Sequence, residues 1–95
     1  MSALLAAEPD SLPYCYSVEA HAEPSVMARV IEQFAKRGLL PSRCMAVLEG
    51  SNAEALVIDV QIAGLEPEVA EHIARSLGQL AYVERVLFTR AHRAS

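Results

Sequence analysis

The four residues Ala22–Ser25, "AEPS", are the part of the sequence best placed to hold a ligand. Apolar residues recur at helical spacing after Pro24, so these residues should lie at the start of a helix. A helix N-terminus offers free backbone N–H groups and a partial positive charge, and it can therefore bind an anion. His21, just before it, could contact a ligand or titrate near neutral pH, but we favour a solvent-exposed loop histidine.

The rest of the sequence offers little catalytic chemistry. It contains no Ser–His–Asp arrangement, phosphate-binding loop or paired-carboxylate motif, and the acids at 66, 68 and 71 suit the start of a second helix. Cys15 and Cys44 form no CxxC motif. Their predicted strands are separated by a third, about 9.5 Å apart, which is beyond disulfide reach. We predict two free thiols, no catalytic residue, no metal ligand and no cofactor.

Length and composition indicate one small domain. The chain has 95 residues, a net charge of −4 and 53% apolar residues. So apolar a composition in a domain of this size predicts a buried interface between chains. The chain has few aromatic residues and no basic stripe, so we expect no nucleic acid partner. Its N-terminal apolar run is short, and no basic residue precedes it. We therefore expect neither a signal peptide nor a membrane helix, and we predict a cytoplasmic protein.

The hydrophobic pattern predicts six elements in the order strand, helix, strand, strand, helix, strand. The strands are expected over residues 14–20, 42–50, 54–63 and 82–90, and the helices over 24–37 and 67–80. On the first helix, Gln33 is placed on the polar side, opposite an apolar stripe made of Val26, Met27, Val30, Ile31 and Phe34. These elements form a single domain over residues 14–90, between a leader at 1–13 and a tail at 91–95.

This order favours an α+β fold, the ferredoxin-like βαββαβ sandwich. Right-handed crossovers place both helices on one face of a four-stranded antiparallel sheet, in the spatial order fourth, first, third, second. The second strand is then an edge with an apolar middle, which invites pairing with another chain. The edge residues that we expect at a dimer interface are Arg43, Cys44, Met45, Ala46, Val47 and Leu48. The open face should show Val57, Val83 and Leu87, together with Val47 or Met45.

Three uses of this fold fit the sequence poorly. An acylphosphatase-like enzyme needs an arginine in its anion-binding loop, but the loop "HAEPS" has an acid instead. A metallochaperone needs two soft ligands in that loop, and an RNA-recognition module needs aromatic residues on its open face. The use that remains is small-molecule sensing at a subunit interface.

Two runs of residues resemble the ACT domain, and most closely the short regulatory subunits of acetolactate synthase. The similarity spans Tyr14 to Phe88, and its matching positions are Arg29, Val30, Phe34, Arg37 and Gly38 in the first run and Leu77, Leu80, Val83 and Val86 in the second. The resemblance implies a homodimer through edge strands and helices. It also implies regulation of branched-chain amino acid synthesis through a catalytic subunit, with a ligand such as valine between the first loop and the partner's edge strand.

On this resemblance the ligand-binding positions are Ala22, Glu23, Pro24, Ser25, Val26, Met27 and Leu40. The family's loop asparagine falls on Ala22, its glycine on Ser25 and its second asparagine on Leu40. Alanine supplies neither donor nor acceptor, and Glu23 would repel a carboxylate, although Ser25 could cap the helix or bind a ligand. We therefore expect a non-catalytic regulatory subunit with weakened amino acid binding. The alternatives are a stand-alone amino acid sensor and, less favoured, an acylphosphatase-like enzyme.

Overall fold

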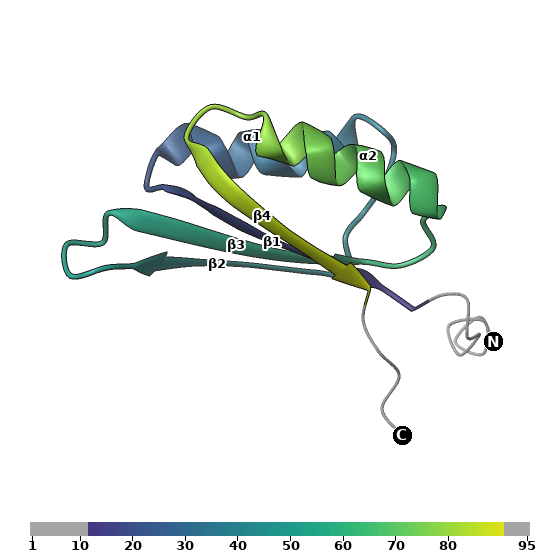
Figure 1. Ribbon diagram of the computed structural model, residues 1–95, viewed down its shortest axis with the longest axis horizontal. Helices are drawn as coiled ribbons and strands as arrows, with labels where there is room; N and C mark the ends of the chain where they lie inside the picture. The colour runs from purple at the N-terminus through teal and green to yellow at the C-terminus, as the bar shows by residue number, and fades with distance from the viewer. Residues whose placement is uncertain (1–11, 91–95) are drawn as a thin grey trace, which may run out of the picture.

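The computed structural model describes residues 12–90 and contains the six elements in the predicted order (Figure 1). They are β1 (Tyr14–His21), α1 (Pro24–Ala35), β2 (Arg43–Glu49), β3 (Ala55–Ile62), α2 (Pro67–Gly78) and β4 (Val83–Arg90). Both helices end two residues before the predicted position, where the chain continues as turns. The tail predicted at 91–95, and the leader apart from residues 12 and 13, lie outside the described residues.

The four strands form one antiparallel sheet in the order β2-β3-β1-β4, as predicted. Both helices cover the same face, which makes the chain a ferredoxin-like α+β sandwich (Figure 1). The central strands show clean alternation, because one side faces the helices and the other does not. β2 and β4 are the two edges, and β2 is paired with β3 alone among the described residues.

The core lies between the sheet and the two helices, and Tyr16 stands at its centre. The Tyr16 ring packs against Phe34 of α1 and Phe88 of β4, with centroids 5.4 and 5.0 Å away. Its buried hydroxyl donates a hydrogen bond of 2.9 Å to the carbonyl oxygen of Ala70 in α2. The other core side chains are Tyr14, Val18, Ala20, Val26, Val30, Leu56, Ile58, Val60, Ile62, Ile73 and Leu77.

Gln33 and Val83 do not lie where the sequence pattern placed them. Gln33 was placed on the polar side of the first helix, but it is only 7% exposed, and its Oε1 has no hydrogen-bond partner within residues 12–90. Val83 was placed on the open face, but it packs against the core. The cause is a bulge at which Glu19 pairs with Arg85 and Ala20 with Val83, so Glu84 is left as an extra residue.

We predict that Tyr16→Phe lowers the free energy of unfolding by about 1 kcal/mol, because it removes the buried hydrogen bond to Ala70. Burial also raises the pKa of Tyr16 above its ordinary value of about 10. The unfolded chain therefore loses the proton first, and stability that is fully present below pH 10 falls as the pH rises further. Urea unfolding from pH 8 to 11 should show this loss in the wild type.

The loss of unfolding free energy above pH 10 should be smaller in Tyr16→Phe than in the wild type. Tyr82→Phe is the matched control, because the Tyr82 side chain is half-exposed and makes no such bond among the described contacts. An equal alkaline loss in the wild type and in Tyr16→Phe would contradict the prediction.

Gln33→Met should raise the free energy of unfolding by about 1 kcal/mol. The substitution keeps the volume and removes a buried carbonyl oxygen that has no partner in the described chain. Chemical denaturation measures the change, and the exposed Gln79→Met serves as the control. A loss of stability in Gln33→Met would mean that the amide has a partner in solution.

Candidate functional site

A hollow of about 460 Å³ lies between the start of α1 and the edge strand β2. We call it the corner hollow. It is lined by Ala22, Glu23, Pro24, Met27, Ala46, Leu48, Ala53 and Leu56. Residues far apart in the sequence thus come together at the corner that the sequence singled out.

Backbone hydrogen bonds fix the loop that begins this corner. The His21 N–H donates to the carbonyl of Tyr82 (2.9 Å), and the Ala22 N–H donates to that of Glu54 (3.0 Å). The loop is thereby tied to the chain on both sides of β1. Glu23 occupies the N-cap position without a side-chain hydrogen bond, and Pro24 begins the helix where a missing N–H costs little.

The strand alternation of β2 divides its residues between the two faces of the sheet. Cys44, Ala46 and Leu48 pair with core residues of β3 and lie on the helix side. All seven residues of β2 are nevertheless exposed, and Leu48 is 58% exposed. Met27 and Ile31 of α1, which the pattern assigned to the buried stripe, are also exposed. An apolar strip made of Met27, Ile31, Ala46 and Leu48 therefore borders the free edge.

The structure brings together four of the seven ligand-binding positions expected from the resemblance. Ala22, Glu23, Pro24 and Met27 line the corner hollow. Val26 is in the core, Ser25 lies in the first turn without capping it, and Leu40 is 89% exposed outside the hollow. Ala53 and Leu56 were missed, because Ala53 lies in the turn that joins β2 and β3 and Leu56 reaches the hollow through its pairing with Ala20 of β1.

The corner hollow suits an apolar or neutral group better than an anion. Glu23 is the ionisable side chain among its described lining residues, and the remainder are apolar. His21 does not line it; its Nε2 lies 2.8 Å from Glu84 Oε2 in an exposed ion pair. Within residues 12–90 no group of three His, Cys, Asp or Glu side chains is arranged to hold a metal ion.

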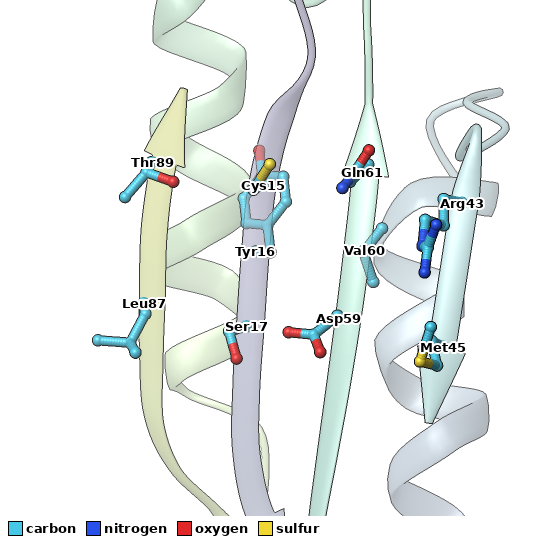
Figure 2. A pocket seen from close by; sticks show the side chains of 10 residues that line it. All are labelled: Cys15, Tyr16, Ser17, Arg43, Met45, Asp59, Val60, Gln61, Leu87 and Thr89. Atoms are coloured by element: carbon cyan, nitrogen blue, oxygen red, sulfur yellow. The ribbon is translucent and has the colours of Figure 1, made fainter. Parts of the chain in front are cut away.

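A second hollow, of about 420 Å³, lies on the opposite face of the sheet (Figure 2). We call it the open-face hollow. Its floor comes from β1 and β3, and Arg43, Met45, Leu87 and Thr89 of the edge strands rise around it. Cys15 lies here, whereas Cys44 lies on the helix side; both are free thiols, as predicted. Partial burial raises the pKa of Cys44 above its ordinary value.

The geometry defines a class of protein: a ferredoxin-like domain whose candidate site lies beside an edge strand with no partner on its outer side within residues 12–90. Comparison with known proteins then identifies the family. The sequence model of the ACT-like domain matches residues 7–95, so the chain belongs to the ACT-like domain family. No curated protein sequence matches the chain significantly.

Solved structures share this fold at low sequence identity. The C-terminal domain of the MgtC protein from Mycobacterium tuberculosis is 15% identical with a TM-score of 0.71, covering 93% of this chain and 96% of that one. The ACT domain of GTP pyrophosphokinase from Chlorobium tepidum is 6% identical with a TM-score of 0.68, covering 82% and 97%. The regulatory subunit of aspartate kinase from Thermus flavus is 13% identical with a TM-score of 0.62, covering 84% and 52%.

These likenesses confirm the ACT fold expected from the sequence motifs. At such low identities they establish the fold alone. The chemistry of the site must therefore be argued from the residues of this chain. None of the three is an acetolactate synthase subunit, so the resemblance to such subunits rests on the sequence motifs alone. Neither helix in the described part of the chain is long and apolar enough to cross a membrane.

Proposed function

We propose that this chain is a non-catalytic regulatory subunit. It forms a homodimer through β2 and α1 and binds the catalytic subunit of a branched-chain amino acid biosynthetic enzyme of the acetolactate synthase kind. The regulatory role is supported by the corner hollow, which lies beside an edge strand whose outer side has no partner within residues 12–90. The choice of enzyme rests on the sequence resemblance alone.

The edge of β2 supports the homodimer. Its outer N–H and C=O groups are unpaired within residues 12–90, and its middle carries none of the proline or charge that usually protects an edge. A second β2 added antiparallel would extend the sheet to eight strands. It would also bury the strip of Met27, Ile31, Ala46 and Leu48, at roughly 1.5–3 kcal/mol for each large apolar side chain that is fully buried.

The same geometry supports a weakened effector site. A second chain at β2 would close the corner hollow, which is within the usual size of small-molecule sites, roughly 300–1,000 Å³. The carboxylate of an amino acid would then lie near Glu23 without a basic side chain among the described lining residues to offset the repulsion. This favours a domain that keeps the interface and binds valine poorly.

The second candidate is a stand-alone amino acid sensor, and the volume of the corner hollow is the observation that favours it. An acylphosphatase-like enzyme is the third and least favoured. A phosphoryl group at the start of α1 would meet Glu23 rather than an arginine, so the transition-state charge would be opposed.

Leu48→Lys should weaken the homodimer at least about tenfold, because it places a charge in the apolar strip. Sedimentation equilibrium from low to high micromolar concentration measures the dissociation constant. The matched control is Leu87→Lys, a residue of similar exposure (46%) on the opposite face of the sheet. A wild-type monomer at high micromolar concentration, or equal weakening by both variants, would overturn the dimer.

In calorimetry the wild type should bind valine, leucine or isoleucine only weakly. Glu23→Gln should tighten valine binding severalfold, because it removes the repelling charge, whereas Glu32→Gln, outside the corner hollow, should not. Tight wild-type binding that Met27→Trp abolishes would instead establish the sensor.

The partner is tested separately with the tagged chain expressed in its native cell. Acetolactate-forming activity that depends on thiamine diphosphate should copurify with the chain. The same copurification is repeated with Leu48→Lys, which weakens the dimer. Activity that still copurifies with this variant would show that partner binding does not need the dimer. A dimer that carries no such activity would overturn the proposed partner and leave the dimer in place.

A further inference from the structure

The strand β2 is complementary to a second copy of itself. It begins with the basic Arg43, ends with the acidic Glu49 and has only apolar residues between them. All of its residues are exposed, and its outer side has no partner within residues 12–90. Two such strands that pair antiparallel bring the positive end of each to the negative end of the other, which stabilises the pair.

The two charges at the ends of β2 do not meet within one chain. Neither Arg43 nor Glu49 takes part in an ion pair within residues 12–90. They stand at opposite ends of the strand, so their Cα atoms are roughly 20 Å apart. Arg43 lies on the open face with Met45 (Figure 2), and Glu49 shares that face because alternate residues of a strand do. A second copy can therefore supply each charge with its opposite.

Strand geometry limits the registers that two copies of β2 can adopt. Directly opposed residues of an antiparallel pair lie on the same face of the sheet. A twofold axis that keeps the helices of both chains on one side must therefore pass at a residue and not between two residues. An axis at Ala46 pairs the whole of β2 with its copy. The opposed residues are then Arg43 and the partner's Glu49, Cys44 and the partner's Leu48, Met45 and the partner's Val47, and Ala46 and the partner's Ala46.

The neighbouring registers lose this match of charge. An axis at Met45 sets Arg43 opposite the partner's Val47 and Glu49 opposite the partner's Pro41, which has no N–H to donate. An axis at Val47 sets Glu49 opposite the partner's Met45 and carries Arg43 beyond the end of the partner's strand. Each shift also shortens the paired length. Charge and length thus select the same register.

We propose that two copies of this chain pair through β2 with the twofold axis at Ala46, held in register by two ion pairs between Arg43 and the partner's Glu49. This inference rests on the proposed homodimer and adds the register to it. The apolar strip on the helix side contributes buried area, which does not depend strongly on register. The ion pairs on the open face form in one register alone.

This register also brings one residue of the partner to the corner hollow. Ala46 and Leu48 line the hollow from β2. The residue opposite Leu48 is Cys44 of the partner subunit, which lies on the helix side, as the hollow does. Partial burial raises the pKa of this thiol, so it is uncharged at neutral pH. The partner's Cys44 therefore borders the hollow without offsetting the charge of Glu23, in keeping with weak amino acid binding.

Charge reversal tests the register, with the dissociation constant of the dimer measured by sedimentation equilibrium. Arg43→Glu and Glu49→Arg should each weaken the dimer about tenfold, because each sets like charges opposite one another at two places. The double variant Arg43→Glu/Glu49→Arg restores two opposite-charge pairs with their signs exchanged. Its dissociation constant should return to within about threefold of the wild type. Because the two residues of one chain cannot meet, pairing between chains is what produces this recovery.

Arg75→Glu is the matched control, because it makes the same charge reversal at an exposed residue of α2. It should leave the dissociation constant unchanged. A double variant that dimerises no better than the single variants would overturn the register while leaving the homodimer in place. A wild-type monomer at high micromolar concentration would overturn the homodimer itself, so the two failures are distinguishable.

Disulfide formation locates the axis independently of the charges. In a Cys15→Ser/Cys44→Ser background, a cysteine at the axis lies opposite its own copy, with Cα atoms about 4.5–5.5 Å apart, which suits a disulfide. Under mild oxidation Ala46→Cys should form a covalent dimer at least about tenfold faster than Met45→Cys or Val47→Cys alone. Mixed together, the Met45→Cys and Val47→Cys chains should link to each other.

The position that links fastest decides the outcome. Fastest linkage of Met45→Cys or Val47→Cys with its own copy would place the axis at that residue and overturn the proposal. So would a dimer in which Ala46→Cys forms no covalent link, because the two chains would then meet through another surface.

Discussion

The exposure of β2 is the constraint on which the rest of this molecule depends. β1 and β3 are hydrogen-bonded on both sides and bury their alternate residues under the helices. Within residues 12–90, β2 pairs with β3 alone, and all seven of its residues are exposed. An apolar strand in that position lacks both the hydrogen bonds and the cover that strands normally have. The corner hollow lies where Met27 of α1 meets the exposed residues Ala46 and Leu48 of this strand.

Much of this arrangement could be predicted from local patterns. The period-2 alternation of β1 and β3 and the proline at the start of each helix predicted the core, the element order and the strand order. The predictions that failed depend on strand register and on helix orientation, which local sequence patterns do not determine. Val83 reaches the core because a single extra residue, Glu84, shifts the register of β4. Gln33 is buried because α1 faces the sheet through Val26, Val30 and Phe34, and not through Met27 and Ile31.

The candidate site could be predicted only in part, for a related reason. Ala22, Glu23 and Pro24 are contiguous at a helix start, so helix chemistry points to them directly. Ala53 lies in the β2–β3 turn, and Leu56 reaches the site through its pairing with Ala20 of β1, and no spacing rule connects either residue to the first loop. Val26 was expected to bind a ligand because of its position in a motif, but it belongs to the core. Neighbours in sequence at a helix start divide between site and core according to which side of the helix they occupy.

The two faces of the sheet are linked through β2 itself. Met45 borders the open-face hollow and Ala46 the corner hollow, although they are adjacent in sequence. A slip of one residue in the pairing of β2 with β3 would exchange the residues on the two faces. The backbone bonds that hold this register therefore also hold both hollows in shape. A second chain paired along the free edge of β2 would fix the register from the other side, so whatever binds at that edge stabilises the open face as well as the corner beside α1.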